Sequence, residues 1–335
     1  FIQSFDVLVL GGQMKINYNI NLAKFQHGSN AATVIKGVAA AGSISLYKQG
    51  LLSHQQGRLH EAKSFYEQCL ALDLKHTDSL HLIGVLNNQW GNPVVAIEYI
   101  SKAIELNPKV AVYHSNLGGA FRSLGQLTEA LDCFDRAVLL DECFVDAHFN
   151  RAVALGELDR LTEALASYAA VIQLKHNHLQ AHFNSAKLFG ALGDYANALK
   201  CYQTVLEIQA TYYDAHIDIA NIFIRMVNFE EAVHSYDAAL AIDPSLVAVH
   251  VAKGHALCEL KRYEDAFFSF KRAIDVKPDC AEAFYGCGLV LDKNKHAEQA
   301  VLSYQRAMAI NPNVPGLLAA WLLAKFSVSN WYGFA

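Results

Sequence analysis

The chain has 335 residues and lacks several features that mark common classes of protein. Its Lys and Arg residues form no extended run and the net charge is −5, which argues against nucleic acid as a partner. No apolar stretch reaches the ~18 residues of a membrane-spanning helix, and the first residues lack the basic-then-apolar order of a signal peptide. We therefore expect no membrane partner and a cytoplasmic protein.

Cysteine pairs of the redox or metal-binding type are also missing. The seven cysteines are Cys69, Cys133, Cys143, Cys201, Cys258, Cys280 and Cys287. No two of them form a C-x-x-C pair, and four stand at helical positions that small or apolar residues otherwise fill. We expect free thiols in a reducing compartment, as opposed to disulfides or a metal site. No nucleophile and base stand together in a recognisable pattern, so the sequence assigns no catalytic residue and no cofactor to this chain.

What the chain does contain is a strict repeat. Alanine recurs every 34 residues, at Ala62, Ala96, Ala130, Ala164, Ala198, Ala232, Ala266 and Ala300. With residue 43 as position 1, eight repeats fill residues 43–314 without insertion or deletion, and alanine is position 20 of each. A fixed period of this length is typical of a solenoid, in which each unit packs only on its neighbours.

Further columns of the repeat predict how each unit packs. Position 8 is always Gly or Ala, and position 24 is aromatic except at Ile100. Positions 4, 7, 8 and 11 share one face of a first helix, and positions 20, 24, 27 and 28 share one face of a second. Small residues at positions 8 and 20 allow the two helices to approach closely, and the aromatic residue fills the space before the next repeat. Gly91, Gly125 and Gly193, with Asp159 in the fourth repeat, predict the turn at position 15.

These columns resemble the tetratricopeptide repeat, and the resemblance covers all of residues 43–314. It implies an all-α fold, a right-handed superhelical solenoid of eight repeats. First helices would line a concave groove at positions 2, 5, 6, 9, 12 and 13, and second helices would form the convex outside. The resemblance also implies that the partners are extended protein or peptide segments bound in that groove.

Histidine fills position 4 in five consecutive repeats, where the family usually has Trp. These residues are His114, His148, His182, His216 and His250. Packed helices lie about 8–10 Å apart, whereas zinc needs ligands that converge at about 2 Å from the ion. We therefore expect histidines that serve in packing, and no metal site.

Position 6 supplies candidate peptide-binding groups for the groove. Its polar residues are Asn116, Asn150, Asn184 and Asp218. Amides at regular spacing can donate to and accept from an extended peptide backbone, and so hold a chain without recognising its side chains. The alternative is that these residues support helix packing.

Position 2 supplies a candidate acidic rim of the groove. Its acidic residues are Asp78, Asp146, Asp214 and Glu282. Such groups could accept hydrogen bonds from Ser or Thr hydroxyls or from a basic segment. The alternative is stabilisation of helix N-termini, worth about 0.3–1 kcal/mol each.

Residues 1–42 do not follow the repeat. Residues 6–12 have the apolar run and the Gly-Gly of a first strand and turn in nucleotide-binding units, but the remaining glycine pattern is absent. We expect an irregular segment without a nucleotide site, followed by a helix near residues 31–42 that caps the array.

After the repeats, residues 315–328 are expected to form a ninth first helix with no second helix to follow. Leu317, Leu318, Trp321, Leu322 and Phe326 make this helix strongly apolar, although the end of a solenoid needs a polar cap. We therefore expect more protein to pack here, either further along the same chain or from a partner.

The last residues resemble a domain junction. In the O-GlcNAc transferase and SPINDLY-like family, the tetratricopeptide array ends at a Cys-Asp-Trp-x-x-aromatic sequence before the glycosyltransferase domain. Here Trp331 and Phe334 match, while Ser329 and Asn330 replace Cys and Asp. Trp321, Phe326, Trp331 and Phe334 are the candidate junction residues.

This second resemblance implies that the chain is the protein-substrate recognition part of a protein O-glycosyltransferase. The parent enzyme would use a nucleotide-sugar donor, and its C-terminal catalytic domain would lie beyond residue 335. The alternative is a stand-alone scaffold that assembles protein complexes without catalysis.

Overall fold

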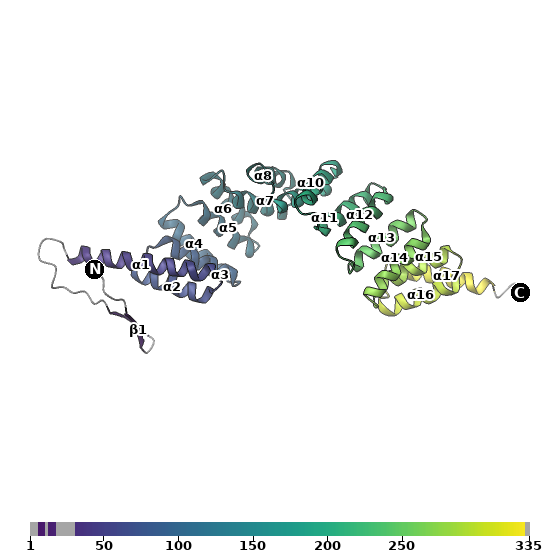
Figure 1. Ribbon diagram of the computed structural model, residues 1–335, viewed down its shortest axis with the longest axis horizontal. Helices are drawn as coiled ribbons and strands as arrows, with labels where there is room; N and C mark the ends of the chain where they lie inside the picture. Colours follow the sequence, from purple (N-terminus) through teal and green to yellow (C-terminus); the bar gives the residue numbers. More distant parts are fainter. Residues whose placement is uncertain (1–5, 11–12, 18–30, 332–335) are drawn as a thin grey trace. The chain divides into compact units, whose positions relative to one another are not determined.

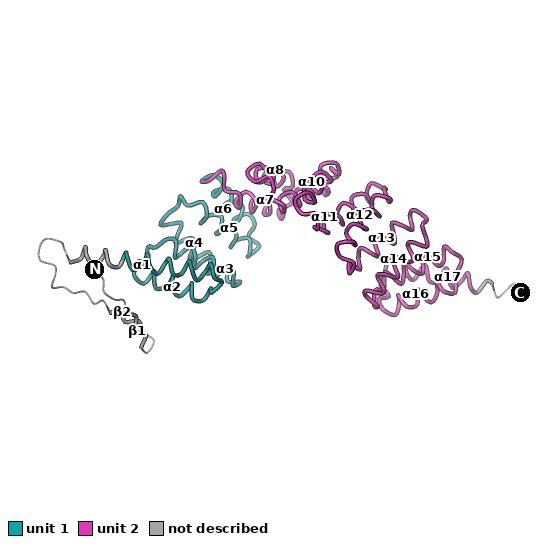
Figure 2. Tube along the Cα trace, viewed as in Figure 1, with its two compact units in different colours: residues 1–140 teal, residues 141–335 magenta. Residues whose placement is uncertain are grey.

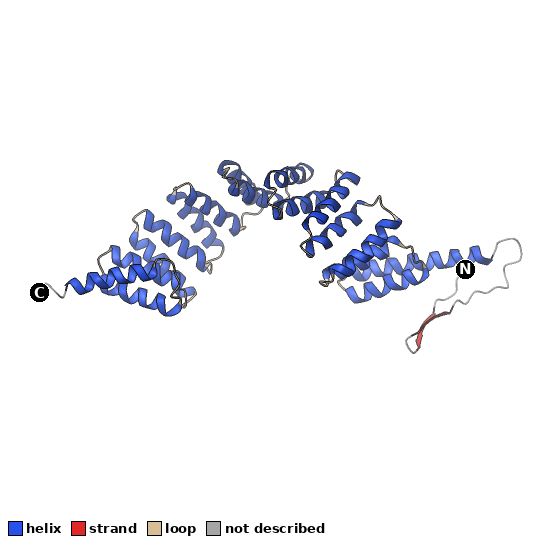
Figure 3. Ribbon diagram, turned by 180° about the vertical axis from the view of Figure 1, so that it is seen from behind, coloured by secondary structure: helices blue, strands red, loops and turns tan. Residues whose placement is uncertain are grey.

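The computed structural model describes the backbone of residues 6–10, 13–17 and 31–331 and the side chains of residues 40–328. The chain divides into two compact units, residues 1–140 and residues 141–335, and each is described by itself (Figure 2). In both units the helices form antiparallel pairs, one pair for each repeat (Figures 1 and 3). The all-α repeat architecture expected from the 34-residue period is confirmed.

The first unit holds three repeats. Its helices are α1 (Ala31–Gln55), α2 (Leu59–Leu72), α3 (Thr77–Gln89), α4 (Pro93–Leu106), α5 (Ala111–Ser123) and α6 (Leu127–Leu140). Within this unit, each helix packs on the next one along the chain. Odd-numbered helices are the first helices of their repeats and even-numbered helices are the second, at the positions that the alanine column predicts.

Residues 1–42 differ from the expectation in two ways. Strands β1 (Asp6–Leu10) and β2 (Gln13–Asn17) pair in an antiparallel hairpin, with Asp6 opposite Asn17. A nucleotide-binding unit instead places a helix after its first strand, so the hairpin rules out that arrangement for residues 6–17. The expected capping helix near residues 31–42 is not separate, because α1 runs without a break into the first helix of the first repeat. No Pro interrupts the helical residues at that point, and Gly37 and Gly42 both lie within α1.

The second unit holds five repeats and a final helix. Its helices are α7 (Val145–Glu157), α8 (Leu161–Leu174), α9 (Leu179–Ala191), α10 (Tyr195–Ile208), α11 (Tyr213–Arg225), α12 (Phe229–Ile242), α13 (Val247–Glu259), α14 (Tyr263–Val276), α15 (Ala281–Lys293), α16 (Ala297–Ile310) and α17 (Leu317–Trp331). Successive helices again pack on one another.

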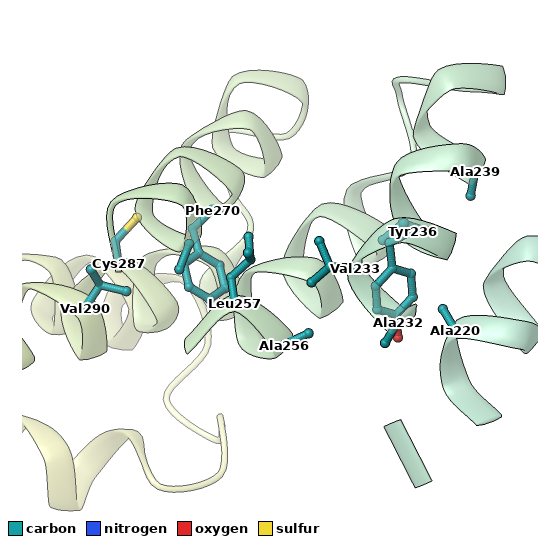
Figure 4. Packing of buried hydrophobic residues seen from close by; sticks show 12 residues of the cluster. Ala220, Ala232, Val233, Tyr236, Ala239, Ala256, Leu257, Phe270, Cys287 and Val290 are labelled. Carbon is teal, nitrogen blue, oxygen red and sulfur yellow. The ribbon is translucent and has the colours of Figure 1, made fainter. Parts of the chain in front are cut away.

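In the second unit, the aromatic residue Phe270 at position 24 on α14 joins its repeat to the next. Its side chain is fully buried beside Leu257 and Val290, in a cluster that spans α11 to α15 (Figure 4). A Cβ atom added to Gly254 would lie 2.6 Å from the Phe270 ring, and one added to Gly286 would also overlap it. Small residues on two successive first helices therefore make the space that the ring fills. The sequence predicted that the aromatic residue fills the space before the next repeat, but it did not predict that Gly286, at position 6, borders that space.

Position 15 adopts the left-handed backbone conformation in all eight repeats. The φ angles there run from +59° to +80°, and the N–H of position 16 donates to the carbonyl of position 11 at 2.8–3.0 Å. This pattern is the Schellman motif, which ends a helix at a residue with positive φ and normally selects Gly. Four repeats have Gly there, the fourth repeat has Asp159, and the last three have Val227, Lys261 and Lys295. A left-handed conformation costs a residue with a Cβ about 1–2 kcal/mol, so these turns are strained.

We expect Val227→Gly to raise the free energy of unfolding by about 0.5–1 kcal/mol. The substitution removes the strain of the left-handed conformation from the folded state. Glycine also gives the unfolded chain more conformational entropy, which offsets part of this stabilisation. Val227 is 71% exposed, so little packing is lost. The matched control is Gly193→Val at the same position of another repeat, where an added Cβ meets no atom within 4 Å. That variant should melt at a lower temperature than the wild type, and a rise in both variants would contradict the strain.

The ninth first helix forms, but it starts at Leu317 and not at residue 315. Gly316 precedes it with a φ of +79°. Leu317 and Ala324 are fully buried, and Trp321 packs partly against the same cluster. The opposite face of α17 exposes large apolar side chains, namely those of Leu318, Leu322, Leu323 and Phe326. Trp331 ends α17, but its side chain and the whole of Phe334 lie outside the described residues.

Candidate functional site

In the second unit, position 6 links neighbouring repeats through tyrosine hydroxyls. Asn184 on α9 donates its amide Nδ2 to the Tyr168 hydroxyl at 3.1 Å, and the Tyr202 hydroxyl donates to Asp218 Oδ2 on α11 at 2.9 Å. Both tyrosines are the position-24 residues of the preceding repeat. The polar groups are half-buried, so each keeps part of its surface on the first-helix face. Asn184 and Asp218 thus have the packing role that the sequence left open, and the Oδ1 atom of each takes part in neither of these hydrogen bonds.

Burial raises the pKa of Asp218, while the Tyr202 hydroxyl and the Lys187 ammonium act in the opposite direction. Burial and the nearby Asp218 carboxylate both raise the pKa of Tyr202, which keeps its proton. The hydroxyl therefore acts as the donor in this pair. Asp218 Oδ1 remains available to accept a hydrogen bond, and the half-buried carboxylate favours a donor that carries positive charge.

In the first unit, the corresponding amide belongs to a different cluster. Asn116 Nδ2 lies 2.8 Å from His81 Nε2, and the His81 ring packs on Tyr113 with centroids 4.5 Å apart. His81 is only 5% exposed, and burial lowers its pKa to about 4, against a smaller opposing effect of Asp78. His81 is therefore neutral near pH 7 and accepts the amide proton. Asn150, the remaining residue of the column, lies half-buried on α7.

The four acidic residues of position 2 have different surroundings. All four stand in the first turn of a first helix, where a negative charge is stabilising. Asp78 accepts a hydrogen bond from the Tyr113 hydroxyl, and Glu282 lies 3.7 Å from the Cys280 thiol. Asp146 and Asp214 are exposed. The acidic residues therefore alternate with uncharged residues at position 2, and the exposed ones are Asp146, Asp214 and Glu282.

The histidines of position 4 bind backbone and hold the turn between repeats. The Nε2 atoms of four of them lie 2.8–3.0 Å from the carbonyl oxygen six residues earlier, which is position 32 of the preceding repeat. These histidines are His114, His148, His182 and His250. Their packing role is confirmed for these four residues. Among the described residues, no three His, Cys, Asp or Glu side chains gather as a metal site would require.

A cleft of about 580 Å³ opens on the first-helix face between α11 and α13. Tyr213 and Ile217 line one side, Leu246 and Val249 line the other, and Tyr236 of α12 lies between them. Asp214 and Asn221 are the polar side chains that α11 contributes to the cleft. The sequence analysis did not identify this feature.

Two alanines explain why the cleft is here. Position 2 and position 6 are Ala248 and Ala252 in the seventh repeat, and both line the cleft. The preceding repeat has Asp214 and Asp218 at the same positions. Without a polar group at position 6 of the next repeat, the Tyr236 hydroxyl donates to Asn221 Oδ1 on its own repeat at 2.9 Å. The interruption of both columns by alanine was the sequence signal that could have located the cleft.

Comparison with known proteins identifies the repeats. Family models described as "Tetratricopeptide repeat" match residues 44–76, 77–110 and 183–247, and one described as "TPR repeat" matches residues 118–159 and 254–295. No curated protein sequence matches the chain significantly. None of the helices in the described part of the chain is long and apolar enough to cross a membrane.

Solved structures share the fold at low sequence identity. One is Pseudomonas aeruginosa PilF, 16% identical, with a TM-score of 0.55 over 62% of this chain and 94% of that one. Another is a tetratricopeptide repeat protein from Parabacteroides merdae, 19% identical, with a TM-score of 0.53 over 74% of this chain and 98% of that one.

Proposed function

Since this chain is a tetratricopeptide repeat protein, a class that mediates protein–protein interaction, we propose that its second unit holds an extended segment of a partner protein along the first-helix face. The observation that carries the proposal is the column of position 6 on α7, α9 and α11. Asn150, Asn184 and Asp218 stand in successive repeats, and tyrosine hydroxyls orient the last two. Oriented amides and carboxylates at the spacing of the repeat suit a peptide backbone, which offers donors and acceptors at regular intervals.

Asp146 and Asp214 support the same proposal from the rim. Both carboxylates are exposed on the first turns of α7 and α11, two repeats apart. They favour segments that carry hydroxyl or basic side chains. The free state of all seven cysteines agrees with a reducing compartment such as the cytoplasm.

The double substitution Asn150→Ala and Asn184→Ala tests the proposal. A random dodecapeptide phage library panned on the full chain supplies the probe, and one enriched peptide is synthesised with a fluorophore. We expect the double variant to bind this peptide about tenfold more weakly, because each lost hydrogen bond is worth about 0.5–1.5 kcal/mol. Fluorescence anisotropy measures the affinity, and circular dichroism confirms that the variant is folded.

The matched control removes two amides from second helices, through Gln173→Ala and Gln203→Ala. Both side chains are exposed on α8 and α10. This control should bind as the wild type does. Equal affinities for all three proteins, or a library that yields no enriched peptide, would contradict the proposed peptide-binding face.

We further propose that the array selects acceptor proteins for an O-GlcNAc-transferase-like catalytic domain. The support is the resemblance of residues 329–334 to the junction of that family, together with the exposed apolar face of α17. On that face, Leu318, Leu322 and Phe326 would contact the catalytic domain. The gene sequence beyond codon 335 tests this proposal, since a glycosyltransferase domain must follow, and a stop codon close to that point would instead favour a scaffold without catalysis.

A further inference from the structure

The cleft between α11 and α13 continues along both helices. A second hollow of about 430 Å³ shares Tyr236 and Ala252 with the first. Ile224, near the C-terminal end of α11, and Glu259, at the C-terminal end of α13, line this second hollow. The two hollows therefore lie next to each other at Tyr236 and Ala252, along the two first helices, and we call them together the trough. Each hollow falls in the range of small-ligand pockets, about 300–1,000 Å³, so the trough has room for a side chain together with its flanking backbone.

The walls of the trough are apolar, and its charges have one sign. Neither hollow is lined by Lys or Arg, whereas Asp214 lies at one end of the trough and Glu259 at the other. Within the described residues, no basic side chain forms an ion pair with Asp214. A ligand that covers this carboxylate with an apolar group would leave a charge without a partner, which is unfavourable. A ligand with a Lys or Arg side chain beside Asp214 would instead form an ion pair with its carboxylate.

Asn221 gives the trough a directional polar group. Its Oδ1 atom accepts the hydrogen bond from the Tyr236 hydroxyl, so the two N–H donors of its amide remain for a ligand. Asn221 is exposed and lines the same hollow as Asp214. A backbone carbonyl of a bound peptide is a suitable acceptor for these donors.

We propose that the trough is a side-chain specificity site, which binds an extended segment at a large apolar or aromatic residue with Lys or Arg beside it. The apolar side chain enters the hollow between Ile217 and Leu246, the basic group meets Asp214, and the Asn221 amide donates to the backbone between them. The inference rests on the proposed function and deepens it. The position-6 column holds the backbone of the segment, whereas the trough selects its sequence.

Peptides enriched from the random dodecapeptide library on the full chain test the inference directly. We expect them to share a Phe, Tyr, Trp, Leu, Ile or Met next to a Lys or Arg. Ala252→Asn fills the trough with the amide that three other repeats carry at the same position, so the fold accepts it. This variant should bind an enriched peptide at least tenfold more weakly, because the apolar side chain is no longer buried. Ala252→Ser, which adds a single oxygen, is the matched control and should stay within about threefold of the wild type.

The substitution Asp214→Asn tests the contribution of the charge to peptide affinity separately from that of the apolar contact. We expect it to weaken the enriched peptide severalfold, but to leave unchanged the affinity of the same peptide with its basic residue replaced by Gln. The inference is overturned if the enriched peptides share no apolar–basic pair, or if Ala252→Asn binds them as the wild type does. In that case, weaker binding by the Asn150 and Asn184 double variant would still uphold the proposed function. A library without any enriched peptide would overturn both.

Discussion

Replacing Phe270 by alanine is expected to lower the free energy of unfolding by about 3–5 kcal/mol, the usual cost of removing a buried aromatic side chain. Phe270 is fully buried, and its ring fills a space bounded by Gly254 of its own repeat and Gly286 of the next. Glycine has no side chain that could move into the vacated volume, so the cavity should persist. Guanidinium unfolding followed by circular dichroism measures the loss. Amide hydrogen exchange should show the loss of protection in α13, α14 and α15, because repeats contact only their neighbours.

Phe268→Ala is the control for this prediction. Phe268 lies on the same helix but is 61% exposed, with the Arg272 guanidinium 5.1 Å from its ring centre. Its removal should cost no more than about 1 kcal/mol, the value of an exposed cation–π contact. If the two variants lose the same stability, the ring of Phe270 does not join the repeats as described.

Acidification is expected to destabilise the first unit through His81. Burial lowers the pKa of His81 from 6.5 to about 4 in the folded chain. Between these two values the unfolded chain binds a proton that the folded chain does not, so stability falls as the pH falls. A change in pKa from 6.5 to about 4 corresponds to about 3 kcal/mol of folding free energy. This contribution is fully present above pH 6.5 and is lost by about pH 4.

His81→Gln separates this effect from other titrating groups. The glutamine does not titrate, and its side-chain oxygen can still accept the Asn116 amide proton that His81 Nε2 accepts at 2.8 Å. Burial also lowers the pKa of His54, but that group is unchanged in the variant. Stability measured between pH 7 and pH 4 should therefore fall less steeply in His81→Gln than in the wild type. Parallel profiles for the two proteins would show that His81 is not held neutral by the fold.

Periodic features of this protein were predictable from sequence because each position of a solenoid repeat recurs in an equivalent environment. The alanines of position 20 and the aromatic residues of position 24 identified which helix faces are buried. They also indicated a first and a second helix in each of the eight repeats. The turn at position 15 was predictable where Gly stands, but Val227, Lys261 and Lys295 gave no such signal. Their backbone conformation follows from the geometry of the helix pair and not from the residue itself.

For the candidate site, the sequence predicted only which repeat position supplies the polar side chains, namely position 6. The sequence placed Asn184 and Asp218 on the first-helix face, but it could not show that tyrosines of the preceding repeat bind them. The sequence analysis also predicted an irregular segment in residues 1–42. It missed the hairpin of residues 6–17, because such a hairpin depends on pairing between strands, which repeat periodicity does not reveal.

By itself, the sequence determined the fold class, the number and register of the repeats and the residues that line each helix interface, since these depend on spacing along one chain. Only the tertiary structure decided which polar groups remain available to a ligand. Asn221 is oriented by Tyr236, His81 is buried against Tyr113, and Ala248 and Ala252 open a trough beside Asp214. Each of these features depends on which side chains the neighbouring helix places there. Hydrogen bonding and close packing act between residues that are close in space but many positions apart in the chain.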